Sequence, residues 1–215
     1  MKKVVLIVLA ILVILIIIAF IGLRSMMRGP DLSAYESLRE PRIRTLPSQL
    51  MLVVELKGDP NVVGRKAFGT LFKYYFQLKG VQKAGPPPAP RARWPLALDT
   101  PKGEWVGIYG LPVPPSYQVP HEMVLDPLVK FRIWDYGEVA EILHVGPYTA
   151  EAPTVEKLKA FISAQGYKVV GDHEEEYLRG PGMFGKGDPK KYYTIIRYRV
   201  EKAQPDTVLK QTQAN

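Results

Sequence analysis

Apolar and polar residues follow two different periods along the middle of this chain. Residues 51–56 (MLVVEL) form an apolar run of strand length, and residues 61–79 then place apolar side chains three and four positions apart, as a helix does. Residues 139–145 (VAEILHV) and 149–165 repeat this order later in the chain. A glycine follows each helical pattern, and glycine is the residue that most often ends a helix.

Two more strand-like runs follow each predicted helix, so the order strand, helix, strand, strand occurs twice. These runs are residues 94–98, 104–111, 174–178 and 192–200. The two repeats extend from about residue 42 to 118 and from about 128 to 202. Neither repeat has enough layers to bury both faces of its own sheet. The pattern therefore predicts an α+β fold: a duplicated βαββ module with one curved, largely antiparallel sheet and two helices on one face.

A different pattern precedes the repeats. Uncharged, mostly apolar residues run without interruption from Val4 to Leu23, whereas a helix on a soluble core carries polar residues on one side. At about 1.5 Å per residue this segment is ~30 Å long, the thickness of a bilayer core. A signal peptide, the alternative, has a shorter apolar run and a small-residue cleavage site. The sequence therefore predicts a single transmembrane helix within residues 1–25 and a connector over residues 26–41.

The charges around the apolar run nearly balance, so the positive-inside rule favours neither orientation. The very short N-terminal segment is typical of a signal anchor, and we expect the domain on the extracytoplasmic side of the membrane. Further arginines between residues 39 and 44 favour the opposite orientation. At the other end of the chain, the polar and aperiodic residues 203–215 predict a disordered tail.

Composition excludes several kinds of site. The net charge is +8, but the basic residues are scattered rather than clustered, so we expect no nucleic-acid binding. Without cysteine the chain has no disulfides and no thiolate metal site. His121, His144 and His173 lack the spacing of metal ligands, and the sequence contains no phosphate-binding loop or nucleophile elbow. We therefore expect neither a metal nor a cofactor.

Residues 173–178 (HEEEYL) predict a strand with three consecutive glutamates. Alternation places Glu175 on one face together with Tyr177. It places Glu174 and Glu176 on the other face, where we expect them to be solvated. Glu175 then has three possible roles, which the sequence leaves open. It neutralises a cationic ligand, it acts as a general base, or it accepts a hydrogen bond from a tyrosine.

If both helices cover one face of the sheet, the other face is open and can form a ligand groove. Aromatic residues are frequent on the predicted strands and at the start of the second helix. The ligand-binding residues predicted for this groove are Glu175, Tyr177, Tyr148, Trp105, Tyr109 and Tyr198. Glu175 is also the one candidate catalytic residue, should the protein be an enzyme.

The second repeat carries short motifs in a characteristic order. HVGPY (144–148) closes a strand, GY (166–167) follows the helix, and EEY (175–177) lies on the next strand. In this order the motifs resemble the GyrI-like small-molecule-binding domain, the effector-binding domain of AraC- and MerR-type regulators. The first repeat, from about residue 44 to 111, is similar to it more loosely.

The resemblance implies a duplicated βαββ module with a ligand cleft where the halves meet. Glu175 would lie at the floor of that cleft, with Tyr177 and Tyr148 beside it. Members of the family bind cationic or amphipathic molecules, some hydrolyse cyclopropane-bearing compounds, and others inhibit DNA gyrase. This chain departs from the family because it has an apolar N-terminal segment and no helix-turn-helix. Residues 194–196 (TII) also lack an acidic residue that the family often has there, which weakens a two-acid hydrolytic mechanism.

The leading hypothesis is a membrane-tethered domain that captures a small cationic or amphipathic molecule in an aromatic cleft with a central glutamate. One alternative is a hydrolase of strained, electrophilic small molecules that uses the same cleft. The other is a protein-interaction adaptor that uses the proline-rich residues 85–95. The sequence leaves open the identity of the ligand, turnover, protein partners and the oligomeric state.

Overall fold

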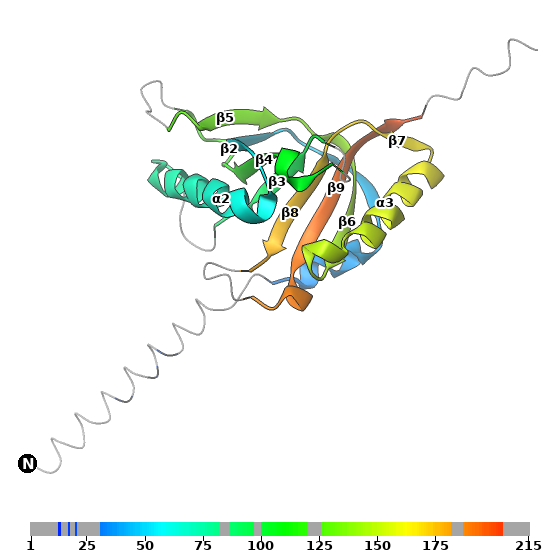
Figure 1. Ribbon diagram of the computed structural model, residues 1–215, viewed down its shortest axis with the longest axis horizontal. Helices are drawn as coiled ribbons and strands as arrows, with labels where there is room; N and C mark the ends of the chain where they lie inside the picture. Colours follow the sequence, from blue (N-terminus) through cyan, green and yellow to red (C-terminus); the bar gives the residue numbers. More distant parts are fainter. Residues whose placement is uncertain are drawn as a thin grey trace, which may run out of the picture. The chain divides into compact units, whose positions relative to one another are not determined.

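The computed structural model describes residues 31–81, 87–96, 100–119, 126–181 and 187–203, together with Val13, Ile17 and Phe20. The chain divides into two units, Met1–Asp31 and Leu32–Asn215. In the first unit, the three isolated residues are helical and exposed. The second unit contains the strands and helices described below (Figure 1).

The second unit alternates strands with helices. Its elements, with η for a 3-10 helix, are η1 (Ser33–Arg39), β1 (Arg42–Leu46), β2 (Gln49–Lys57), α2 (Pro60–Gln77), β3 (Arg91–Trp94), η2 (Lys102–Glu104), β4 (Val106–Pro112), β5 (Val129–Trp134), β6 (Gly137–Val145), η3 (Tyr148–Ala150), α3 (Ala152–Ala164), β7 (Tyr167–Val169), β8 (His173–Arg179), η4 (Pro189–Lys191) and β9 (Tyr193–Lys202). The first repeat of the sequence corresponds to β2-α2-β3-β4, and the second to β6-α3-β8-β9.

The strands pair antiparallel in the order β1-β6-β9-β8-β3-β4-β2-β5, and β7 pairs with β9. The repeats meet at the β3–β8 pair, where Ala92 lies opposite Glu175. The strand that precedes each repeat pairs with the other repeat, because β1 pairs with β6 and β5 pairs with β2. Ser48 lies between β1 and β2, and Asp135 lies between β5 and β6. A hydrogen bond of 2.6 Å from Ser48 Oγ to Asp135 Oδ1 joins these two connections. Each repeat therefore depends on the other to complete its part of the sheet.

Both α-helices lie on one face of the sheet (Figure 1). α2 packs on residues of β2, β3 and β4 that include Ala92, and α3 packs on residues of β6 and β9 that include Ile196. Ala92 and Ile196 each lie directly opposite Glu175 in the strand register. Directly opposed residues point to the same face of a sheet. The antiparallel sheet with two helices on one face is therefore the observed arrangement.

The predicted fold class is wrong in its first element, the transmembrane helix. Within the described part of the chain, no helix is both long enough and apolar enough to cross a bilayer. A crossing needs about 20 apolar residues in one continuous helix, and α2 and α3 instead bury one side against the sheet. Most of residues 4–23 lie outside the described residues. The single-pass topology, the membrane association and the extracytoplasmic location that depended on this helix are therefore not supported.

Part of the predicted connector has regular structure. η1 places Leu38 against Leu143 and Ile195, on the face of the sheet that the α-helices leave free. The predicted disordered tail lies outside the described residues from residue 204 onward. Packing on the sheet therefore begins before β1 in the second unit.

A buried network of charges on the helix-free face is centred on Arg197. Its guanidinium contacts Glu174 at 2.7 Å, Glu141 at 3.0 Å and Glu176 at 3.1 Å. From β3, Arg93 Nε adds a contact of 2.7 Å to Glu174. Burial lowers the pKa of Arg197, but the three carboxylates together raise it by more. The prediction that Glu174 and Glu176 are solvated is therefore wrong, because alternation identifies their face but not the arginines that meet them there.

Replacing Arg197 by glutamine is expected to lower the free energy of unfolding by roughly 3–5 kcal/mol, because it leaves buried carboxylates without their central counter-charge. Arg199, two residues along the same strand, is exposed, so Arg199→Gln should change the stability by less than about 0.5 kcal/mol. Chemical denaturation of both variants measures the difference. Equal stabilities would contradict a role for the network in joining β6, β8 and β9.

Candidate functional site

The central strand β8 carries the candidate site on the helix-bearing face of the sheet. Glu175 lies opposite Ala92 and Ile196, which belong to the two helix-covered cores, and its side chain is 7% exposed. Figure 1 shows β8 passing between α2 and α3. From the sequence we expected Glu175 and the aromatic residues of the site to line an open groove on the helix-free face. The structure instead places them on the covered face, where the two repeats meet.

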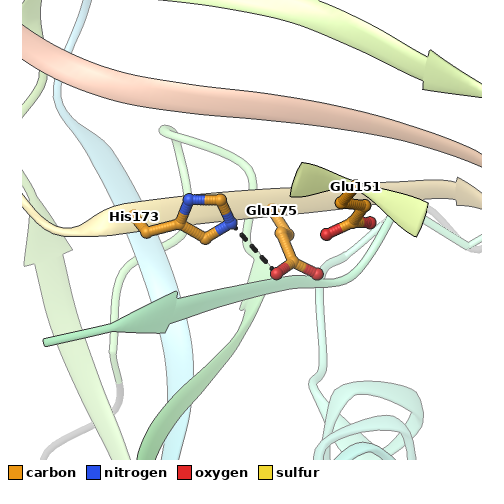
Figure 2. Close-up of side chains that lie close together, drawn as sticks. All are labelled: Glu151, His173 and Glu175. Atoms are coloured by element: carbon orange, nitrogen blue, oxygen red, sulfur yellow. Dashed lines mark hydrogen bonds and ion pairs between the residues drawn. The ribbon is translucent and has the colours of Figure 1, made fainter. Parts of the chain in front are cut away.

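Two carboxyl groups and an imidazole come together at this point. Glu151 immediately precedes α3, yet its side chain makes no capping hydrogen bond to that helix. It lies beside Glu175 instead, as Figure 2 shows. His173 Nε2 lies 3.1 Å from Glu175 Oε1, and His173 Nδ1 lies 2.7 Å from the hydroxyl of Tyr198. One donor atom from each of Glu151, His173 and Glu175 lies within 4.8 Å of the other two.

The environment of the acids is unfavourable for negative charge. Burial, reinforced by the neighbouring Glu175, raises the pKa of Glu151 to about 9, so Glu151 is protonated at neutral pH. Its Oε1 atom is buried without a hydrogen-bond partner. Among the residues that the structure describes, no lysine or arginine forms an ion pair with either acid, and Glu175 contacts His173 alone in this way. Within the described residues, the site therefore has no lysine or arginine to balance its carboxyl groups.

Tyrosines surround the two acids. Tyr177 donates a hydrogen bond to Glu175, and burial followed by the charge of Glu175 raises the pKa of Tyr177 well above its usual value. The ring of Tyr148 meets that of Tyr177 edge-on, with 5.5 Å between centroids. Burial and then Glu175 raise the pKa of Tyr109 and of Tyr198 to about 12. The hydroxyl of Tyr109 is buried and has no hydrogen-bond partner.

The structure brings together most of the residues predicted for the site, namely Glu175, Tyr177, Tyr148, Tyr109 and Tyr198. Trp105 lies elsewhere. Its ring packs against Trp94 at 5.2 Å, and its Nε1 donates a 2.6 Å hydrogen bond to the carbonyl oxygen of Thr100. These contacts make Trp105 part of the core beneath α2. The ligand-binding role of all six residues stays a prediction.

Sequence reasoning missed Glu151 and assigned no role to His173. The available signal for Glu151 was its position directly before a helix that begins Ala-Pro. Serine, threonine, aspartate and asparagine are preferred at that position, so a glutamate there is unusual. A glutamate that does not cap its helix is free to point elsewhere. Glu151 thereby places a second carboxyl group beside Glu175.

A cavity of about 210 Å³ lies on the other side of the sheet. Arg93, Tyr136, Glu174 and Arg197 are among the residues that line it. Its principal charges already pair with one another, as Arg93 and Arg197 both contact Glu174. The sheet separates this cavity from Glu175, so it is not part of the candidate site.

Comparison with solved structures finds relatives of this fold, whereas comparison of the sequence with known families and curated proteins finds none. An uncharacterised conserved protein from Listeria innocua matches with a TM-score of 0.64 and 24% identity, over 80% of this chain and 99% of its own. A hydrolase from the same organism matches with a TM-score of 0.61 and 21% identity, over 81% and 100%. The C-terminal domain of EcmrR matches with 0.59 and 14%, over 76% and 98%.

At these identities the likeness shows the fold alone. The fold is consistent with the GyrI-like fold that the motifs between residues 137 and 200 predict. One fold supports many functions. The function of this chain therefore has to be argued from the side chains of its own site.

The buried Glu151 is expected to make stability depend on pH. Its folded pKa of about 9 lies above its ordinary value of 4.5, so between these values the folded state holds a proton that the unfolded state releases. The stability from Glu151 is therefore present at low pH and lost as the pH rises towards about 9, by up to about 1.4 kcal/mol per pH unit.

Glu151→Gln should reduce this slope between about pH 5 and about pH 8, because glutamine does not titrate. Glu156→Gln, an exposed position on α3, serves as the control and should keep the slope of the parent chain. Urea denaturation at several pH values measures it. Parallel curves for the parent chain and Glu151→Gln would show that Glu151 is not buried as a neutral acid.

Proposed function

We propose that this protein binds a small organic cation, with Glu175 facing its charge and the tyrosine rings enclosing its body. The environment of Glu175 carries this proposal. Its side chain is buried, and in the described part of the chain its ionic contact is to His173 alone. A buried carboxylate without a counter-charge costs several kcal/mol. A ligand that brings a positive charge removes this cost and gains affinity from it.

The tyrosines supply the second element of recognition. Ring faces attract cations by roughly 0.5–2 kcal/mol. Tyr148 is the most accessible of these rings, at 36% exposure, and it contacts Tyr177 on one side and Tyr192 on the other. A Cβ atom on Gly180 would come within 2.7 Å of the Tyr148 hydroxyl, so a larger residue at position 180 would clash with Tyr148 in its present position. A ligand with one positive charge and an apolar body matches this combination of acid and rings.

One observation favours a second candidate function, hydrolysis of a strained electrophile. Glu151 is a neutral acid beside the Glu175 carboxylate. In this reaction Glu175 accepts a proton from water while the water oxygen bonds to the electrophilic carbon. Glu151 then donates its proton to the leaving atom as that bond breaks. Carboxyl groups held in unlike environments are a common arrangement for such acid–base work.

Tetraphenylphosphonium, a permanent cation with four apolar rings, is a suitable probe for the binding proposal. Glu175→Gln should weaken its binding at least about tenfold, or about 1.4 kcal/mol, because the charge opposite the ligand is lost. Glu176→Gln removes a carboxylate from the adjacent residue, which faces the other side of the sheet, and should leave the affinity unchanged. Isothermal titration calorimetry measures both, with thermal unfolding as a check on folding.

Triphenylphosphine oxide has similar rings but no net charge, so it separates charge from shape. The parent chain should prefer the phosphonium, and Glu175→Gln should lose that preference. If the parent chain binds neither compound, or if Glu175→Gln retains the preference, the cation-binding proposal fails.

Glu151→Gln distinguishes binding from hydrolysis. It should preserve tetraphenylphosphonium binding, because glutamine resembles the neutral form of Glu151. It should slow hydrolysis of an activated cyclopropane by about 100-fold or more, since a general acid contributes about 10²–10⁴ to a rate. Product formation under saturating substrate measures the second effect. A parent chain that produces no product is not a hydrolase of this kind, whatever it binds.

A further inference from the structure

We propose that Glu151, His173 and Glu175 form a binding site for a divalent transition-metal ion of the zinc type. The three side chains come from two places in the fold, the residue before α3 and one face of β8. One donor atom of each lies within 4.8 Å of the others. Figure 2 shows the imidazole and the two carboxyl groups gathered in one row.

The spacing of the donors suits a metal ion. Bonds from zinc to nitrogen and oxygen are about 2.0–2.2 Å, so two tetrahedral ligands lie roughly 3.3–3.5 Å apart. His173 Nε2 and Glu175 Oε1 are 3.1 Å apart, close to that spacing. The donor atom of Glu151 lies within 4.8 Å of both of these atoms. Two of the three ligands are therefore arranged for coordination before an ion arrives.

Unsatisfied polar atoms give independent support for a missing ligand. Glu151 is 9% exposed and its Oε1 has no hydrogen-bond partner in the described structure. Tyr109 is 1% exposed, and its hydroxyl, which senses the charge of Glu175, also has no partner there. Buried polar atoms without partners are rare and need an explanation. An ion held by Glu151 would satisfy the unpartnered carboxyl oxygen of that residue.

The second nitrogen of the imidazole is also held. His173 Nδ1 lies 2.7 Å from the hydroxyl of Tyr198, and both groups are buried. A histidine that binds a metal through one nitrogen normally donates its other N–H to an acceptor, which fixes the ring and its tautomer. Without an ion, Nε2 donates to the Glu175 carboxylate. When an ion replaces that proton, Tyr198 acts as a positioning residue, because its hydroxyl accepts from Nδ1–H and leaves the lone pair of Nε2 for the ion.

The donor set selects the class of metal. One imidazole nitrogen and two carboxylate oxygens suit zinc and its neighbours among the first-row divalent ions. Calcium takes six to eight oxygen ligands and magnesium prefers an oxygen octahedron, so neither matches a site with an imidazole. Three protein ligands leave at least one position for water. Histidine spacing along the sequence did not predict this site because Glu151 comes from another element.

This inference goes beyond the proposed function but shares one residue with it. An organic cation requires Glu175 and the rings, whereas a metal ion also requires Glu151 and His173. Because both occupants use the carboxylate of Glu175, zinc and tetraphenylphosphonium should compete. The two proposals can therefore fail separately.

Zinc alone tests the site, using the untagged full chain stripped with a chelator and titrated against a chromophoric zinc indicator. We expect about one zinc ion per chain. Glu151→Gln and His173→Gln should each weaken binding by at least about tenfold, and Tyr198→Phe should weaken it by about tenfold while retaining its ring. Glu156→Gln, on the exposed side of α3, should bind zinc as the parent chain does. Tetraphenylphosphonium affinity should survive Glu151→Gln, which separates the two proposals.

Cobalt gives a spectroscopic check that does not depend on affinity alone. Co²⁺ in the site should produce visible absorption of a four- or five-coordinate ion with nitrogen and oxygen ligands, and this spectrum should disappear in Glu151→Gln. That variant removes an unsatisfied acid and is therefore expected to fold. A parent chain that binds no zinc overturns the metal site, and so does zinc affinity that is unchanged in both Glu151→Gln and His173→Gln. Either result leaves the cation-binding proposal standing.

Discussion

Arg197 makes the interaction on which the rest of the structure depends. From β9 it joins Glu141 of β6 to Glu174 and Glu176 of β8, and all four side chains are largely buried. A strand that slips by one residue turns every side chain to the opposite face of its sheet. The network therefore holds β8 in a single register, since any other would bury its glutamates away from the arginines. That register places Glu175 on the helix-bearing face.

The two faces of β8 consequently differ in their electrostatics. On the helix-free face, the glutamates form ion pairs with arginines. On the helix-bearing face, Glu175 meets tyrosines, His173 and the neutral acid Glu151. Within the residues that the structure describes, arginines pair with the glutamates of one face, whereas neither a lysine nor an arginine forms an ion pair with Glu175 on the other. This asymmetry is the reason for proposing a positive ligand on the covered face, whether an organic cation or a metal ion.

Duplication places this asymmetry at the junction of the repeats. β1 and β5 each complete the sheet of the other repeat, and β3 pairs with β8 at the centre. Tyr109 comes from the first repeat, whereas Glu151 and Glu175 come from the second. The site therefore exists only when both repeats have folded together. Its inner part is enclosed because each repeat contributes one helix to the same face.

Local periodicity by itself determined the repeated order of strands and helices and the pairing of Glu175 with Tyr177 on one face. Both follow from backbone geometry over a few residues. The same kind of reasoning failed when the length of the apolar run at residues 4–23 was taken to predict a membrane-spanning helix. Tertiary structure alone decided what each face meets: Arg197 for Glu174, Glu151 for Glu175, and Trp94 for Trp105. Most of these partners lie far apart along the chain, and only the packing of α3 and the pairing of β3, β8 and β9 bring them into contact.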